Sequence, residues 1–240
     1  MKLTLNLFDI MICHKHKCIF IHISKCAGTS VERAFGYYIN TPGALAAHLG
    51  WDAKHKLYIQ HATPQQLFDL NLINETQWDE YYKFIIYRNT WTKLHSDYYW
   101  VSKSHNIDDT FENFLAKKGG FKEVLNTRNT KYCGDHLYKQ KDYFYINGNR
   151  IKYDLEIDFD YLEKGFKTLT DRLNLDPNFF STKHNVGNNK PQHFTQFYTK
   201  NTIKMVKDLY QEDLNFFDFD YKQPKKISKL LKLKMLLNKI

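Results

Sequence analysis

The residues from Ser24 to Ser30 combine a lysine, a glycine and two hydroxyl groups directly after a short apolar run. Lys25 supplies a full positive charge, and Gly28 lets the backbone approach a ligand closely. Thr29 and Ser30 can add hydroxyl donors or cap a following helix. The N-terminus of a helix carries unpaired N–H groups and the positive end of the helix dipole, so it favours an anion. We therefore expect this loop to hold the phosphates of a nucleotide donor.

The order of Lys25 and Gly28 argues against a Walker A loop, which reads G-x-x-x-x-G-K-[ST] with the lysine after the second glycine. Here the lysine comes first, and no glycine lies upstream of it in the loop. ATP hydrolysis by the usual P-loop route is therefore not expected. Taken alone, the segment is also compatible with an ordinary strand-to-helix turn that carries a lysine without function.

Arg88 and Ser96 form a second pair of candidate ligands. Arg88 follows another apolar run, and Ser96 lies about two helical turns further along the chain. A planar arginine fork together with a hydroxyl suits a second, separate phosphate. On their own, these residues are more simply interpreted as a salt-bridged arginine and a serine on a helix surface.

Both candidate loops follow segments with the pattern of buried strands. Residues 18–23 and 81–87 are short runs rich in apolar side chains, and helices are expected over residues 31–38 and 91–103. Strands that alternate with helices predict a single α/β domain with a mostly parallel central sheet flanked by helices. In such sheets ligands bind beyond the carboxyl ends of the strands, where both loops lie.

Further elements are expected in the second half of the chain. The segment 109–115 has a helix start signal, and residues 143–146 and 151–159 are expected to form a hairpin around Asn147-Gly148-Asn149. Apolar residues at helical spacing predict a helix over 162–173 and a last one over 199–217.

The chain carries a net charge of +9, from 35 basic and 26 acidic residues. This favours an anionic ligand, such as a nucleotide, an acidic glycan, nucleic acid or a membrane, or it reflects a solvated basic surface. Seven lysines and no acid lie in residues 222–240, so the expected domain, residues 1–221, is only mildly basic. The tail has the pattern of a basic amphipathic helix that rests on an anionic membrane or a partner chain, or it is a frayed end.

The cysteines form no CxxC pair, so a disulfide scaffold is not expected and a reducing compartment is the default. Cysteine and histidine alternate between Cys13 and Cys18, but no second ligand pair follows, and no metal site is expected. No apolar run approaches the roughly 20 residues of a membrane span, and residues 1–12 do not read as a signal peptide. A soluble protein of the cytoplasm or another intracellular compartment, with peripheral membrane contact through the tail, is the expectation.

Together the two sites resemble those of the 3′-phosphoadenosine 5′-phosphosulfate-dependent sulfotransferases, most closely the carbohydrate branch with its glycan and heparan-type O-sulfotransferases. The 5′-phosphosulfate loop of that family reads roughly F-[IV]-H-I-P-K-[TC]-[AG]-G-[TS]-[ST], and residues 20–30 read FIHISKCAGTS. The family's 3′-phosphate site reads roughly F-x-x-x-R-[ND]-P with a serine further on, and Phe84, Arg88, Asn89 and Ser96 match it.

The resemblance extends over residues 18–221. Its weaker parts include His61-Ala62-Thr63 and the segment 158–163. Ser24 and Thr90 stand where the family usually has proline, which only loosens the backbone.

The resemblance implies a P-loop-NTPase-like sulfotransferase fold and in-line transfer of a sulfonate group from 3′-phosphoadenosine 5′-phosphosulfate to a hydroxyl of a carbohydrate, with no metal required. It implies that Lys25 is catalytic, as the cation at the leaving phosphate, and that Arg88 and Ser96 hold the 3′-phosphate. The residues implied at the 5′-phosphosulfate are Lys25, Cys26, Ala27, Gly28, Thr29 and Ser30.

His61 is the candidate catalytic base, because a neutral imidazole can take a hydroxyl proton near pH 7. His22 belongs to the buried strand and is expected to orient the loop. In the polar segment 184–192, His184, Asn185 and Lys190 are expected to close over the donor.

Three other functions remain open at this point. A nucleotide kinase-like P-loop enzyme would need the Walker A order and a magnesium-binding aspartate after a strand, and neither is evident. A non-enzymatic, basic nucleic-acid-binding module would use the charge and the aromatic residues but gives no role to paired loops at strand ends, so no nucleic-acid partner is expected. A sulfotransferase-like fold without activity is the third.

Overall fold

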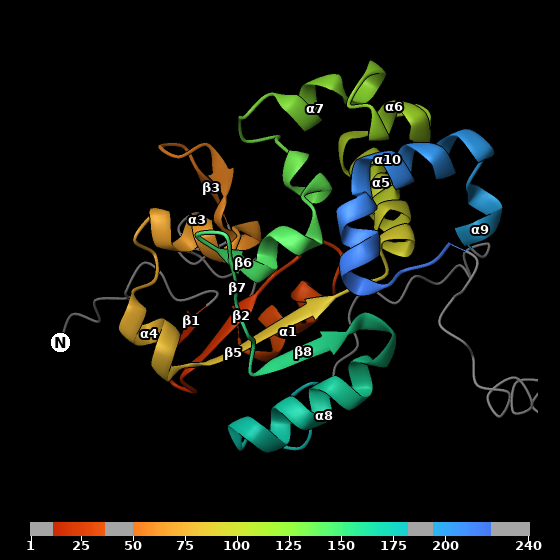
Figure 1. Ribbon diagram of the computed structural model, residues 1–240. Coiled ribbons are helices and arrows are strands. Elements are labelled where there is room, and N and C mark those ends of the chain that lie inside the picture. Colours follow the sequence, from red (N-terminus) through yellow and green to blue (C-terminus); the bar gives the residue numbers. More distant parts are fainter. Residues whose placement is uncertain (1–11, 37–49, 182–193, 222–240) are drawn as a thin grey trace, which may run out of the picture.

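The computed structural model describes residues 12–36, 50–181 and 194–221. Its central sheet has the strand order β1-β2-β5-β8 (Figure 1). The strands β2 (Cys18–Ile21), β5 (Tyr82–Tyr87) and β8 (Leu155–Asp158) run parallel, and β1 (Ile12–Cys13) pairs antiparallel at the edge. The molecule is thus α/β with a mixed central sheet flanked by helices, and three of its four strands are parallel as expected.

Helices occupy the connections and cover the sheet. The α-helices are α1 (Gly28–Ala34), α3 (Pro64–Asp69), α4 (Glu75–Glu80), α5 (Thr90–His105), α6 (Phe111–Leu115), α7 (Lys122–Asn126), α8 (Leu162–Leu173), α9 (Phe194–Phe197) and α10 (Lys200–Phe217). The 3₁₀ helices are η1 (Ile59–His61), η2 (Gly119–Phe121), η3 (Gly134–Leu137), η4 (Gln140–Phe144) and η5 (Phe159–Tyr161). Two small antiparallel sheets pair β3 (Trp51–Asp52) with β4 (Leu57–Tyr58), and β6 (Tyr145–Ile146) with β7 (Asn149–Arg150).

One face of the sheet is aromatic and is covered by α1 and α8. Phe20 of β2 and Phe84 of β5 are paired in register, and their rings stack at 5.0 Å. Phe35, directly after α1, lies 6.5 Å from Phe84 and 6.1 Å from Phe180, which in turn stacks on Phe166 of α8. Burial of these rings fixes both helices beside the carboxyl ends of the parallel strands.

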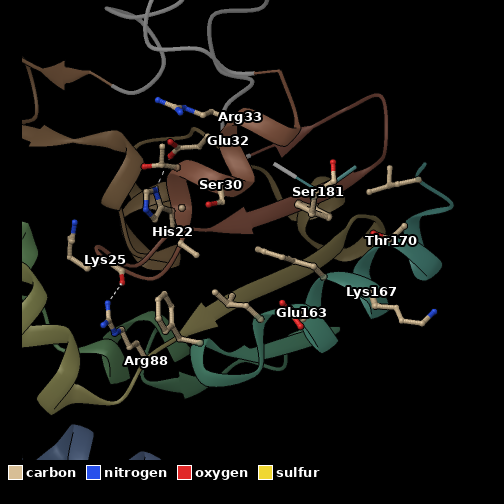
Figure 2. A pocket seen from close by; sticks show the side chains of 18 of the residues that line it. His22, Lys25, Ser30, Glu32, Arg33, Arg88, Glu163, Lys167, Thr170 and Ser181 are labelled. Carbon is tan, nitrogen blue, oxygen red and sulfur yellow. Dashed lines mark hydrogen bonds and ion pairs between the residues drawn. The ribbon is translucent and has the colours of Figure 1, made fainter. Parts of the chain in front are cut away.

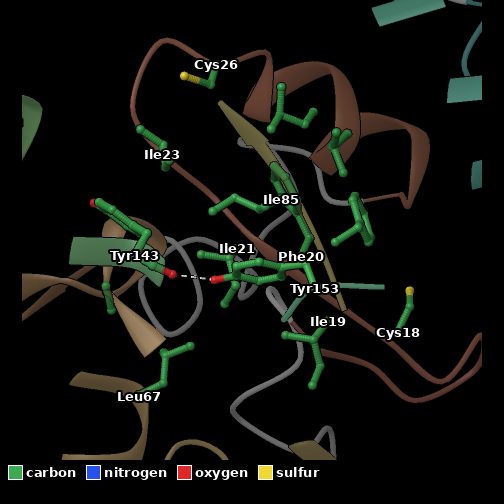
Figure 3. Close-up of a cluster of buried hydrophobic side chains, with 14 of the residues drawn as sticks. Cys18, Ile19, Phe20, Ile21, Ile23, Cys26, Leu67, Ile85, Tyr143 and Tyr153 are labelled. Carbon is green, nitrogen blue, oxygen red and sulfur yellow. Dashed lines mark hydrogen bonds between the residues drawn. The ribbon is translucent and has the colours of Figure 1, made fainter. Parts of the chain in front are cut away.

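The opposite face carries the alternate, aliphatic positions of the same strands. Ile19, Ile21 and Ile85 are fully buried there, and Figure 3 shows Leu67 and Tyr143 on their side of the sheet. Tyr143 belongs to η4, and its hydroxyl donates to the backbone oxygen of His61 at 2.8 Å. The core of the sheet therefore reaches directly to η1, which ends at His61.

A second hydrophobic cluster lies among the helices α5, α6, α7, α9 and α10, on one side of the sheet (Figure 1). Its largest fully buried side chains are Trp91, Phe114 and Phe121. Capping residues precede two of the long helices: the Asn89 side chain accepts from Trp91 N before α5, and Thr199, near which the last helix was expected to begin, forms a capping box before α10.

Two expected elements differ from the structure. The first helix begins at Gly28, three residues earlier than expected, because the loop turns into the helix immediately after Ala27. The expected hairpin exists only as β6 and β7, since the backbone of 155–158 instead joins the central sheet beside β5. The segments 184–192 and 222–240, with the lid residues His184, Asn185 and Lys190, lie outside the described residues.

Every helix among the described residues is too short or too polar to cross a membrane.

Candidate active site

Two parallel strands deliver the two candidate loops to the same edge of the sheet. Ile21 and Ile85 are paired in register, so Lys25 and Arg88 emerge a few residues later at neighbouring positions. The Arg88 guanidinium donates from Nη1 to the backbone oxygen of Lys25 at 3.0 Å (Figure 2). The two loops that the sequence places at strand ends thus meet in one site.

The loop after β2 has a tightly turned backbone. Lys25 and Ala27 both adopt left-handed conformations, with φ of 59° and 63°. Such strain is typical of functional loops, and turns of this kind aim backbone N–H groups into anion-binding concavities. Among the described residues, the N–H groups of Gly28 and Thr29 donate to no backbone acceptor. They are available to a phosphate oxygen.

Gly28 allows the loop to lie against the imidazole of His22. A Cβ atom at this glycine would collide with the His22 ring. The ring stacks on Phe20 at 5.5 Å, and its Nδ1 lies 2.9 Å from Oε1 of Glu32 in α1 (Figure 2). Burial alone would raise the pKa of Glu32, but the neighbouring His22 lowers it. That His22 orients the loop stays a prediction; the structure shows its ring in direct contact with the loop at Gly28.

Arg88 is held by uncharged groups. Its Nε donates to Thr92 Oγ1 at 3.1 Å, and its guanidinium lies 4.2 Å from the centre of the Phe159 ring. The buried side chain of Gln140 forms two hydrogen bonds to the backbone of Arg88. It accepts from Arg88 N at 3.0 Å and donates to Arg88 O at 2.7 Å. No carboxylate of the described residues lies within ion-pair distance of the guanidinium, so its charge is available to a ligand.

Lys25 is the second such cation. Burial lowers its pKa, although the charge of Asp97 acts in the opposite direction. Its ammonium lies 5.6 Å from the centre of the Trp100 ring, and no carboxylate among the described residues is within ion-pair distance of it. Lys25 and Arg88 therefore face the same space, and in the described part of the chain neither is paired with an acid.

That space is a pocket of about 1460 Å³. The expected donor ligands Lys25, Ala27, Gly28, Thr29, Ser30, Arg88 and Ser96 line it together with His22 and His61. Cys26 does not, because its fully buried thiol faces Gln140 Oε1 at 3.9 Å and its N–H donates to Ile23 O. Burial raises the pKa of Cys26 to about 12, so the thiol is neutral.

His61 lies at the end of η1 in the wall of the pocket. Its Nδ1 is 2.5 Å from Oδ2 of Asp135, and its ring meets that of His22 edge to face at 4.8 Å. Burial lowers the pKa of His61 to about 4, despite the opposing effect of Asp135. The imidazole is therefore neutral at physiological pH, as a general base must be.

Three site residues have no counterpart among those expected from the sequence: Asp97, Asp135 and His136. The Nδ1 atom of His136 lies 2.7 Å from Asp97 Oδ1, and the ring lines the pocket. The dipeptide Asp135-His136 directly after Gly134, and the position of Asp97 beside Ser96, are the only local signals that point to them.

Polar atoms of His61, Asp135 and His136 lie within 4.8 Å of one another, a grouping that could hold a metal ion. However, the Nδ1 atoms of both imidazoles are at hydrogen-bond distance from carboxylates. A proton on each Nδ1 accounts for both contacts. That the reaction requires no metal stays a prediction.

A sequence model of the sulfotransferase family matches residues 8–220. The chain belongs to the sulfotransferase family. No curated protein and no solved structure gave a match in the same comparisons. As a sulfotransferase, the protein is a transferase of sulfonate groups whose acceptor carries a hydroxyl. The resemblance seen in the two phosphate motifs is thus confirmed at the level of the family.

Proposed function

We propose that this sulfotransferase moves a sulfonate group from 3′-phosphoadenosine 5′-phosphosulfate to a hydroxyl of a carbohydrate. The proposal rests on two cations, Lys25 and Arg88, that parallel strands deliver into one pocket and that have no carboxylate partner among the described residues. A donor with phosphates at both its 5′ and 3′ positions offers one anionic group to each.

The lining of the pocket supports a specific placement of this donor. The phosphosulfate lies in the loop of residues 25–30, and the 3′-phosphate contacts Arg88 and Ser96. The apolar wall formed by Phe159, Leu162 and Phe166 suits the flat adenine ring. The volume exceeds what a nucleotide alone needs and leaves room for a saccharide.

The chemistry assigned to these residues is an in-line displacement at sulfur. The acceptor oxygen bonds to sulfur while the bond from sulfur to the bridging phosphate oxygen breaks, and 3′,5′-adenosine bisphosphate leaves. The hydroxyl proton moves to Nε2 of His61, since its Nδ1 is engaged by Asp135. Lys25 stabilises the negative charge that develops on the leaving phosphate.

The carbohydrate acceptor rests on the resemblance of the motifs to the glycan branch and on the polar end of the pocket at His61 and His136. A nucleotide kinase is the weaker candidate. Its phosphate lysine follows the second glycine of the loop, whereas Lys25 precedes Gly28.

Calorimetry with 3′,5′-adenosine bisphosphate, 5′-AMP and ATP tests the proposal. We expect the bisphosphate to bind most tightly, because only it places a phosphate on Arg88. The Arg88→Ala variant should bind the bisphosphate about 10- to 100-fold more weakly, the effect of losing hydrogen bonds to a charged group, and 5′-AMP almost unchanged.

Lys25→Ala should instead reduce sulfonate transfer much more than it weakens binding. Transfer is measured with ³⁵S-labelled donor and pooled polysaccharide acceptors. Lys103→Ala, at an exposed position of α5, removes the same charge outside the pocket and serves as the control. Equal affinity for all three nucleotides, or no binding, would contradict the two-phosphate site.

A further inference from the structure

A second imidazole stands beside His61 in the pocket wall. The rings of His61 and His136 meet edge to face at 5.3 Å, and both are almost fully buried around a polar end of the pocket. The proposed function uses only one of them. Burying two histidines costs free energy of folding unless each ring nitrogen has a hydrogen-bond partner, so apolar side chains would fill this space at a lower cost.

Each imidazole is held by its own buried carboxylate. Asp135 lies at His61 Nδ1 and Asp97 at His136 Nδ1, at 2.5 and 2.7 Å. A carboxylate fixes the tautomer with the proton on Nδ1 and leaves a lone pair on Nε2. His136 is thus oriented in the same manner as the candidate base.

Asp97 also ties His136 to the donor loop. Its Oδ1 accepts from the Ser24 hydroxyl at 3.2 Å, and its Oδ2 accepts from Lys93 Nζ at 2.8 Å. Ser24 is the residue before Lys25, and it stands where the related motif usually has proline. One buried carboxylate therefore links the start of the donor loop to this imidazole.

The indole of Trp100 packs against one face of the His136 ring. It stacks on His136 at 4.5 Å with nearly parallel planes, and the Lys25 ammonium lies over the same indole. His136 thus faces the end of the pocket where Lys25 meets the leaving phosphate. This is where an acceptor hydroxyl must approach the sulfur.

We propose that His136 is a second catalytic residue: its Nε2 accepts a hydrogen bond from the carbohydrate acceptor beside His61, and Asp97 is its positioning residue. This inference rests on the proposed function. Two neighbouring imidazole acceptors suit a substrate with adjacent hydroxyl groups, one of which loses its proton to His61 as its oxygen attacks. The other donates to His136 and fixes the sugar.

The His136→Asn variant separates a catalytic from a structural role. Its side-chain NH₂ can replace Nδ1 as the donor to Asp97, but nothing occupies the place of Nε2. We expect a folded protein with unchanged affinity for 3′,5′-adenosine bisphosphate and a transfer rate about 100-fold lower, in the range of a lost acid–base or orienting group. Free imidazole should partly restore transfer in His136→Ala.

Asp97→Asn tests the positioning role, with transfer to the same acceptors as the readout. We expect kcat to fall while the affinity for the bisphosphate stays within threefold. The His105→Gln variant is the control, because this histidine contacts Cys133 Sγ outside the pocket and should transfer normally. The double variant of His61 and His136 should lose less than the product of the single losses, since both act on one acceptor.

Two results would overturn the role of His136 alone: transfer within threefold of the wild type in His136→Asn, or a loss of bisphosphate affinity as large as the loss of transfer. In either case the wild type still sulfates an acceptor, and the proposed function stands. A wild type that binds the bisphosphate but labels no acceptor would overturn both.

Discussion

Lys25 and Arg88 both line the pocket, and the buried acids nearest to them make their close contacts with other groups. Asp97 and Asp135 each lie against an imidazole, and Glu32 lies against His22. Among the described residues, no carboxylate lies within ion-pair distance of either cation. The charges of both side chains are therefore available to the negative groups of the proposed donor and to the charge that develops on its leaving phosphate.

The protonation of His61 should affect how the free energy of unfolding depends on pH, even without substrate. Burial lowers its pKa to about 4, against about 6.5 for an exposed histidine. Between these values the unfolded chain binds a proton that the folded chain does not. The free energy of unfolding should therefore fall as the pH decreases from about 6.5 to about 4.

Thermal unfolding of wild type and His61→Gln from pH 4 to pH 8 measures this effect. The variant should lose stability less steeply on acidification, because its titrating group is gone. Some decline will remain, since burial also lowers the pKa of His95 to about 4. Identical slopes in the two proteins would show that His61 is not buried as a neutral base.

Candidate site residues that belong to local sequence motifs could be predicted from the sequence. Lys25, Gly28 and Arg88 belong to strand-end loops, and the structure places them in one pocket with Ser96 and His61. Asp97, Asp135 and His136 could not be found in this way, because they come from α5 and η3 and meet only through tertiary packing. Their spacing along the chain carries no periodic signal.

At the scale of elements, the unit β2–loop–α1 depends on one glycine. Gly28→Ala should destabilise the protein by about 1–3 kcal/mol, the usual cost of overpacking, because its Cβ would collide with the His22 ring. It should also weaken bisphosphate binding, since the loop must move away from its position. Chemical denaturation and calorimetry measure the two effects.

Gly119→Ala is the matched control for that prediction. This glycine has a φ of 56°, and its Cβ would collide with Asp109; neither residue lines the pocket, so the variant should cost stability without changing bisphosphate affinity. Adding His22→Ala to Gly28→Ala should recover part of the lost stability. Unchanged binding and stability in Gly28→Ala would show that the loop does not rest on His22.

Segments with a strong apolar pattern were correctly predicted as strands or helices. The neighbour with which a strand pairs in the sheet was not always predictable. The apolar runs that became β2 and β5, and the apolar spacing of α8 and α10, led to correct assignments. The segment 155–158 was wrongly paired in a hairpin, because a turn signal at Asn147-Gly148 lies close by. Its true partner is β5, about 70 residues away, which no local pattern identifies.

At the scale of the whole molecule, Gln140 connects the site to the helical part. Its side chain brackets the backbone of Arg88, while its own N–H donates to Asp213 of α10 at 2.9 Å. Gln140 is fully buried, and of its neighbours along the chain Leu137 belongs to the cluster among the helices and Tyr143 to the cluster of the sheet. The position of Arg88 therefore depends on how α10 packs.

Gln140→Met keeps the approximate shape of the side chain and removes its polar atoms. The buried N–H and C=O of Arg88 then lose a partner, which should cost about 2–4 kcal/mol of stability and weaken bisphosphate binding. Urea unfolding and calorimetry test this. Gln211→Met, at an exposed position of α10, should change neither, and an equal effect of both variants would contradict the link.

The turn η3 supplies residues to both carboxylate–imidazole pairs, which limits how acceptor preference can change. Asp135 contacts His61, and the next residue, His136, contacts Asp97, so this turn contributes one member to each carboxylate–imidazole pair. An insertion or deletion in this turn would displace both imidazoles at once. Variants that accept a different hydroxyl-bearing molecule should therefore carry their changes in the surrounding wall of the pocket, while the length of this turn stays fixed.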